Sequence, residues 1–118
     1  MKSKDRIIIQ KIIGYIDDIE QYVKEMQSQD FFEDKKTMTA CAFSLSQIGE
    51  LAKDLDEETV NNITEIPWKS IKGMRNRIVH DYDNVDLSVL WSTIKMSLPE
   101  LKEKLKNIIM NDEDAKLY

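Results

Sequence analysis

One short run of this 118-residue sequence combines side chains that could transfer a proton beside a fixed positive charge. Residues 75–82 read Arg-Asn-Arg-Ile-Val-His-Asp-Tyr, and they include His80, which is the only histidine of the chain. The unperturbed pKa of histidine lies nearest to neutrality, so His80 is the natural proton-transfer group. The guanidinium of Arg75 stays charged and has a planar shape that suits a phosphate. Cleavage of a phosphodiester requires this combination of groups.

The spacing within this run leaves the predicted site incomplete in one chain. On a helix, Asn76 and His80 share a face, whereas Arg75 and His80 are about 140° apart around the axis. Cleavage of RNA by internal transfer without a metal needs a base for the 2′-hydroxyl proton and an acid for the leaving oxygen. One chain offers one histidine. Two chains paired through this helix would offer two His80 imidazoles beside Arg75, so we expect a homodimer.

Ordinary structural roles would account for the same residues. A lone His80 near a helix end can interact with the helix dipole or cap the end. In that interpretation Arg75 and Arg77 are surface cations paired with Glu50 or an aspartate, and Tyr82 is a half-buried aromatic residue. These alternatives stay open on the spacing alone.

The charge distribution narrows the classes of partner. The net charge of −5 argues against a protein that coats nucleic acid generally. The charge is uneven, however, because residues 66–82 contain one acid, Asp81, and four cations. These cations are Lys69, Lys72, Arg75 and Arg77. A local basic patch on an acidic protein permits a limited contact with nucleic acid.

The composition indicates one helical domain without a membrane segment. Hydrophobic residues make up 42% and charged residues 33%, with only three glycines and two prolines. No apolar stretch approaches the roughly 20 residues of a membrane span, and residues 1–6 do not begin a signal peptide. We therefore expect a cytoplasmic protein. One cysteine, Cys41, excludes an internal disulfide, and one His with one Cys cannot supply a typical zinc site, so no metal or cofactor is expected.

Apolar periodicity predicts four main helices. They span residues 4–27, 35–54, 67–82 and 86–111. The apolar stripe of the first is Ile8, Ile12, Tyr15, Ile19, Tyr22 and Met26. Residues 30–34 are interpreted as a connection, and residues 57–65 as a polar segment with a short helical turn. Gly49 would allow a neighbouring helix to approach closely, Pro67 fits the first turn of the third helix, and Pro99 should kink the last.

Long helices joined by short polar connections predict an all-α fold, an antiparallel bundle of four to five helices. The helix that contains Arg75 and His80 would then form the dimer contact. We expect a single domain over residues 1–112 and a frayed tail over residues 113–118.

Beyond the Arg-x4-His-x-Tyr pattern of Arg75, His80 and Tyr82, several motifs occur together in one order. They are Ile48-Gly49-Glu50, Ile66-Pro67-Trp68, residues 75–82, Val85-Asp86-Leu87 with Trp91, and Leu98-Pro99-Glu100-Leu101. Together they resemble the HepT-like branch of the HEPN superfamily over about residues 38–108. The first helix is similar to the family's only in its pattern. The ordered set is far more specific than the three-residue signature, because short motifs recur by chance.

The resemblance implies a HEPN-like bundle that dimerises and brings two copies of the motif into one cleft. It also implies a metal-independent endoribonuclease that acts as the toxin of a prokaryotic toxin–antitoxin pair. Arg75 and His80 would then be catalytic, and Asn76 would orient the site or the RNA. From the basic patch, Arg77 and Lys72 join Asn76 as residues expected to bind RNA or orient the site.

The resemblance further implies a partner, a minimal nucleotidyltransferase antitoxin that uses ATP. This partner would transfer AMP onto Tyr82 and so block the RNA site with a bulky anionic group. Two alternatives are a non-catalytic module that binds a nucleotide or presents substrate to the nucleotidyltransferase, and a purely structural helical dimer. Loss of RNA cleavage on substitution of Arg75 and His80 would separate the first interpretation from both.

Overall fold

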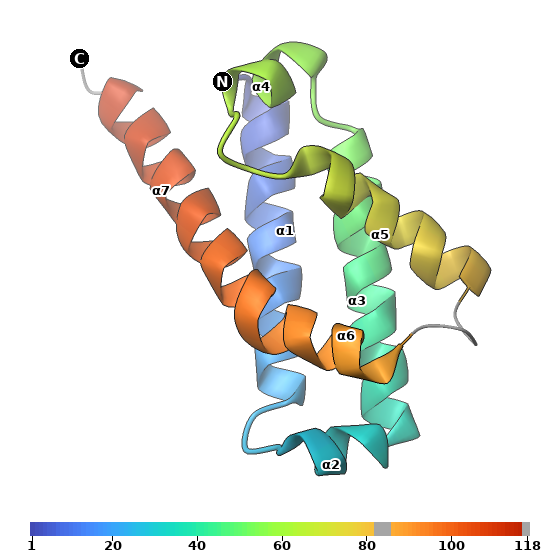
Figure 1. Cartoon of the computed structure of the whole chain (residues 1–118). Helices are drawn as coiled ribbons and strands as arrows, with labels where there is room; N and C mark the ends of the chain where they lie inside the picture. Colours follow the sequence, from blue (N-terminus) through green and yellow to red (C-terminus); the bar gives the residue numbers. More distant parts are fainter. Residues whose placement is uncertain (82–85, 117–118) are drawn as a thin grey trace.

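Two long antiparallel helices, α1 (Ser3–Tyr22) and α3 (Lys35–Lys53), form the centre of the molecule (Figure 1). In this computed structural model the backbone is described for residues 1–81 and 86–116, and the side chains for residues 1–77 and 86–112. Helix α5 (Trp68–Asp81) packs against α3, and α7 (Leu98–Lys116) packs against α1. The described chain is all-α, which confirms the predicted helical bundle.

The remaining elements are short. Helix α2 (Ser28–Phe32) connects α1 to α3, α4 (Glu57–Asn62) lies between α3 and α5, and α6 (Leu87–Ser92) precedes α7. Helix α4 is the helical turn predicted within residues 57–65. The prediction of a connection over residues 30–34 is wrong at its start, because residues 30–32 belong to α2. Phe31 of this helix is fully buried, and the centroid of its ring lies 5.0 Å from that of Trp91.

The buried face of α1 is wider than the predicted stripe. Ile8, Ile12 and Ile19 are buried as predicted, but Ile9 and Ile16 are also buried. The reason is that α1 contacts α3 on one side and α7 on another. Of the other predicted members, Tyr15 and Met26 are half-buried against the core, whereas Tyr22 is 43% exposed. Helix α1 also ends at Tyr22 rather than near Gln27.

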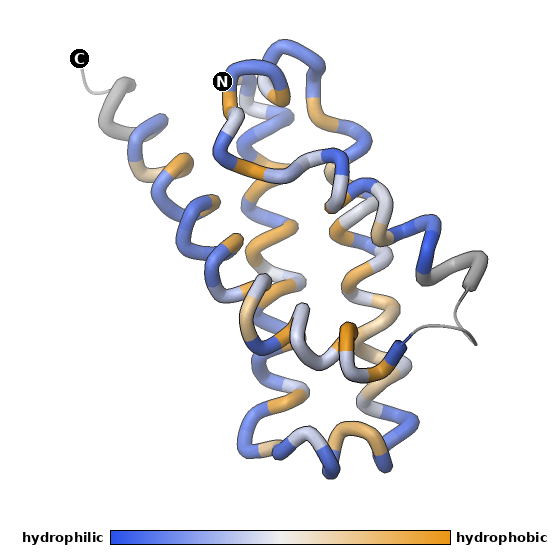
Figure 2. Tube along the Cα trace, viewed as in Figure 1, coloured by the Kyte–Doolittle hydropathy of each residue, from blue (hydrophilic) through white to orange (hydrophobic). Residues whose placement is uncertain are grey.

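The apolar residues of α3 repeat at steps of three and four, as expected of a helix with one buried face. Cys41, Leu45, Ile48 and Ala52 are all buried along α3. Figure 2 shows hydrophobic and hydrophilic segments alternating along α1, α3 and α7, as expected of helices with one buried face. None of the helices within the described ranges combines the length and the apolar character that crossing a membrane would require.

The predicted kink at Pro99 is confirmed. A π-helical turn, Thr93–Ser97, separates α6 from α7, and the chain changes direction there (Figure 1). Pro99 has no N–H with which to continue the α-helical hydrogen bonds, so the ladder is interrupted just before it.

The first residues of the chain contact α7. The Asp112 carboxylate accepts a hydrogen bond from Nη1 of Arg6 at 3.1 Å and lies 3.5 Å from the amino terminus. Helix α7 continues to Lys116. The domain boundary at residue 112 and the frayed tail over residues 113–118 stay predictions, since residues 117–118 lie outside the described residues.

Gly49 confirms the predicted close approach of a neighbouring helix, and that helix is α5. A Cβ atom built on Gly49 would lie 2.8 Å from both the Cβ of Arg75 and the carbonyl oxygen of Ile71. Carbon atoms cannot approach backbone oxygen this closely without displacement, so only glycine allows α3 and α5 to pack at this distance. In contrast, a Cβ on Gly73 of α5 would meet nothing within 4 Å.

We predict that Gly49→Ala lowers the free energy of unfolding by about 1–3 kcal/mol, because α5 must move away from α3. Gly73→Ala is the matched control, and it should raise the free energy of unfolding by up to about 1 kcal/mol through its helix propensity. Urea denaturation of the two variants measures both values. If Gly49→Ala is as stable as Gly73→Ala, the contact at Gly49 does not constrain the packing of α5.

Candidate active site

Helix α5 is anchored at its first turn. The carbonyl of Pro67 accepts a hydrogen bond from the N–H of Ile71 at 3.1 Å, so Pro67 immediately precedes the helix rather than lying within its first turn. The indole Nε1–H of Trp68 donates to the carbonyl oxygen of Ile63 at 2.9 Å. Trp68 and Ile71 are both buried in the core. This anchoring fixes the start of α5 and directs the rest of the helix along α3.

Arg75 lies two turns farther along α5, directly over Gly49. Its Nε–H donates to Oε2 of Glu50 at 3.0 Å, and its Nη1–H donates to Oδ1 of Asn76, also at 3.0 Å. Two acceptors, one from α3 and one from α5, therefore hold the plane of the guanidinium. The pairing with Glu50 was one of the open alternatives, and the structure confirms it.

The guanidinium of Arg75 retains donors for another partner. Arginine has five N–H donors in one plane. Glu50 and Asn76 use two of them, and the side chain of Arg75 is 32% exposed. The remaining donors have the fork geometry that binds phosphate oxygens in a bidentate manner. Arg75 is thus both oriented and accessible to an anion.

The other candidate residues are divided between two sides of α5. Lys72, Asn76 and His80 follow each other at steps of four, which places their backbone positions along one side of the helix. Lys72 is half-buried and Asn76 is exposed. Arg77 is also exposed, but it is two residues from Arg75 and therefore lies on the opposite side of the helix. The structure brings Arg75 and Asn76 together and leaves Arg77 apart.

His80 lies in the last turn of α5, one residue before its end at Asp81. Its backbone position is about 7.5 Å along the axis from Arg75. The surroundings of its side chain, and Tyr82 as a whole, lie outside the described residues. The roles predicted for His80 and Tyr82 therefore stay predictions.

Two residues that could have been mistaken for part of a site pack in the core or against it, namely Cys41 and Trp91. Burial raises the pKa of the Cys41 thiol to about 11, which keeps the thiol protonated and unreactive at neutral pH. Trp91 packs on Phe31, and the Lys95 ammonium lies 5.4 Å from the centre of its ring.

The hydrogen bond between Arg75 and Asn76 was not predicted. Neighbouring residues on a helix do not normally face each other, so their spacing gave no signal for the contact. It is found where Gly49 lets Arg75 lie close to α3 and Glu50 binds its Nε–H.

A family model and individual relatives all point to one family of proteins. A family model described as "Ribonuclease HepT-like" matches residues 12–108. A protein of Thermococcus cleftensis named a probable ribonuclease HepT is 35% identical over 108 residues, covering 92% of this chain and 98% of the relative. A protein of Methanocaldococcus jannaschii named as a candidate RNase is 31% identical over 115 residues, covering 97% and 99%. No solved structure matches the chain significantly.

We predict that Glu50→Gln lowers the free energy of unfolding by less than about 1 kcal/mol, because an ion pair this exposed contributes little to stability. The exposed pair of Lys104 and Glu100, 3.2 Å apart, gives a matched control in Glu100→Gln. Urea denaturation compares the two. A loss as large as that of Gly49→Ala would mean that Glu50 supports the fold rather than orienting Arg75.

Proposed function

This chain belongs to the HepT-like ribonuclease family, and on that premise we propose that it is an endoribonuclease toxin of a prokaryotic toxin–antitoxin pair. Its RNA site is a cleft between two copies of the chain, to which each copy contributes Arg75 and His80. The reaction needs no metal ion. A nucleotidyltransferase antitoxin neutralises the toxin by transferring AMP from ATP onto Tyr82.

The observation that carries the proposal is the way Arg75 is held. Glu50 and Asn76 fix the guanidinium at 3.0 Å each and leave donors directed away from both acceptors. The contact at Gly49 brings the Cβ of Arg75 against α3, beside Glu50. An oriented, partly exposed cation on the same helix as the only histidine is suited to a phosphodiester that reacts beside it.

The chemistry follows from the groups available. One His80 accepts the proton of the RNA 2′-hydroxyl, and the 2′-oxygen attacks the adjacent phosphorus. Arg75 neutralises the charge that accumulates on the phosphoryl oxygens. His80 of the second copy donates a proton to the departing 5′-oxygen. The products are a 2′,3′-cyclic phosphate and a 5′-hydroxyl, and the two imidazoles end with their protonation states exchanged.

The surface of α5 supports a dimer through this helix. In the described part of the chain, the main packing partner of α5 is α3, and α5 lies at the edge of the bundle (Figure 1). Asn76 is exposed, and Lys72 is half-buried beside it. Pairing two α5 helices along this side would bring the basic residues of both copies to one cleft, which offsets the acidic net charge locally.

Tyr82 is suited to the proposed modification by its place in the chain. It follows Asp81, the last residue of α5, and is two residues from His80. A phosphodiester-linked AMP there would add a negative charge and a bulky base near Arg75. The added charge would compete for the free donors of the guanidinium, and the base would exclude RNA from the cleft.

We predict that Arg75→Ala and His80→Ala each lower the rate of RNA cleavage by about 10²-fold or more, because each removes a group that acts in the transition state. Incubation of the purified dimer with total RNA, with EDTA present, measures the cleavage. Lys106→Ala, an exposed cation on α7, is the matched control and should cleave like the wild type. If the unmodified dimer cleaves no RNA, the chain is instead a non-catalytic partner of the nucleotidyltransferase.

We further predict that incubation with the nucleotidyltransferase and ATP adds the mass of AMP to the chain and abolishes RNA cleavage. Tyr82→Phe should show no mass gain and should keep cleaving RNA in the presence of the antitoxin, because the acceptor hydroxyl is absent. Intact-mass spectrometry and the cleavage assay test both statements. Unchanged mass gain in Tyr82→Phe would place the modification at another residue.

A further inference from the structure

One side of α1 carries a row of residues with an unusual symmetry, of which the two central ones are half-buried and the other four are exposed. This row, called the α1 stripe below, consists of Ile7, Lys11, Gly14, Tyr15, Asp18 and Tyr22. The successive spacings are four, three, one, three and four residues, so the pattern is the same in both directions along the helix. All members lie within about 50° of one line on the helix surface.

The chemical types in the α1 stripe are complementary about its centre. Reversal of the stripe exchanges Lys11 with Asp18, a cation with an anion. It exchanges Ile7 with Tyr22, which are 51% and 43% exposed although both are large and apolar. The charged residues and the apolar residues thus each meet a suitable partner when the stripe is laid antiparallel against itself.

The structure leaves these residues available for such a contact. Within the described residues neither Lys11 nor Asp18 forms an ion pair, although the neighbouring Asp17 pairs with Lys102 at 2.6 Å. A Cβ built on Gly14 would meet nothing within 4 Å, so the space above this glycine is open. Lys11, Gly14, Tyr15 and Asp18 also line an open depression of about 590 Å³ between α1 and α3.

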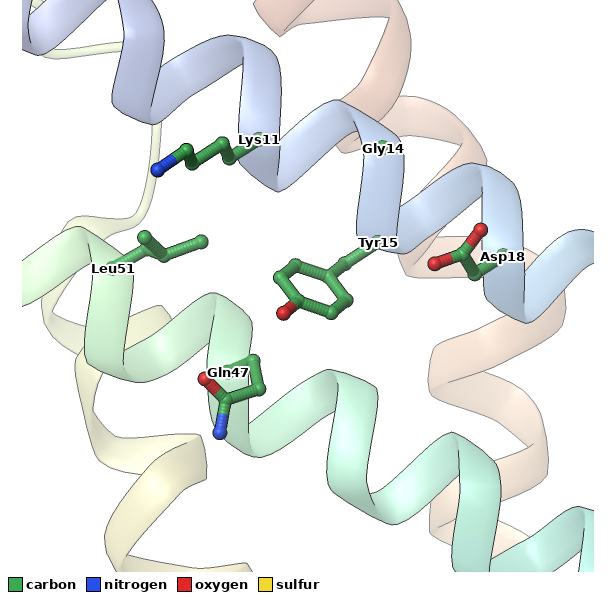
Figure 3. A pocket seen from close by; sticks show the side chains of 6 residues that line it. All are labelled: Lys11, Gly14, Tyr15, Asp18, Gln47 and Leu51. Carbon is green, nitrogen blue, oxygen red and sulfur yellow. The ribbon is translucent and has the colours of Figure 1, made fainter.

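Figure 3 shows how the side chains are arranged around this depression. The ring of Tyr15 projects from α1 toward α3, with Lys11 on one side of it and Asp18 on the other. Gln47 and Leu51 of α3 form the opposite wall. Phe43, one turn from Gln47, is 57% exposed and extends the apolar surface along α3.

We propose that the α1 stripe binds the α1 stripe of a second copy of this chain, with the two helices antiparallel about a two-fold axis between Gly14 and Tyr15. Lys11 of each copy then lies opposite Asp18 of the other, and Ile7 lies opposite Tyr22. The two Tyr15 residues lie side by side across the axis. The contact runs for about 22 Å along each helix. Such a self-complementary patch is the signature of a two-fold interface.

This contact is separate from the proposed RNA cleft. On α3, Gly49 contacts α5, whereas Gln47 lines the depression beside the α1 stripe. Residues two apart on a helix lie on opposite sides, so α5 and the α1 stripe lie on different sides of α3. One copy can therefore use both surfaces at once. Pairing through α5 gives a dimer, and pairing through the α1 stripe joins such dimers into a larger assembly.

Charge reversal provides a direct test. Lys11→Asp places two carboxylates opposite each other at both ends of the contact, and Asp18→Lys places two ammonium groups there. Each variant alone should raise the Kd of this association step at least about tenfold. A mixture of the two variants should restore the association. In the mixed complex, residue 11 of each copy is again opposite in charge to residue 18 of the other. The double variant Lys11→Asp/Asp18→Lys should also associate like the wild type.

Sedimentation equilibrium of the full chain measures the association, and native mass spectrometry identifies the mixed complexes by their masses. Lys106→Asp and Glu103→Lys, reversals at exposed positions of α7, are matched controls and should behave like the wild type. Gly14→Trp should also abolish the association through the α1 stripe. The variant should still fold, since the space above Gly14 is open within one chain. Circular dichroism monitors folding in every variant.

The outcomes separate this inference from the proposed function. Variants that remain dimers and still cleave RNA support the α1 contact and leave the α5 dimer intact. Variants that become monomers support the α1 contact and contradict the α5 dimer. The inference is overturned if each single reversal associates like the wild type, or if mixing the two reversals fails to restore association.

Discussion

The contact between α3 and α5 at Gly49 is the constraint on which the candidate site depends. A side chain at this position would collide with the backbone of Ile71 and with the Cβ of Arg75. Because none is present, Arg75 comes close enough to α3 for Glu50 to bind its Nε–H at 3.0 Å. The same contact fixes the direction of the α5 axis, and with it the backbone positions of Asn76 and His80. The absence of a Cβ at Gly49 thus determines where the guanidinium of Arg75 lies.

The electrostatics of Arg75 follow from this geometry. Glu50 compensates part of the charge of the guanidinium, and Asn76 adds a second acceptor, so the side chain is oriented before any anion arrives. Orientation of this kind lowers the cost of stabilising a charged transition state. Because the ion pair is exposed, it contributes little to the free energy of unfolding. Its main effect is to orient the guanidinium of Arg75. An anionic group close to Arg75 would compete with RNA for the same donors.

Much of this arrangement could be predicted from the sequence, because helix periodicity reports burial directly. The steps from Cys41 to Ala52 placed α3, and Pro99 placed the bend before α7. What the sequence could not provide was the number of neighbours around each helix. Ile9 and Ile16 are buried because α7 covers a second side of α1, whereas Tyr22 at the end of α1 is 43% exposed. Likewise, Gly49 indicated a close approach, but only the folded chain identifies α5 as the neighbour.

The central claim is that two copies of the chain complete one RNA site, with a His80 from each. It is tested most directly with dimers of mixed composition, made by co-expressing wild-type and His80→Ala chains with different tags. If both histidines act in one cleft, the mixed dimer should cleave RNA far more slowly than half the wild-type rate, and close to the rate of the His80→Ala dimer. A mixed dimer with half the wild-type activity would contradict the claim, because each chain would then hold a complete and independent site.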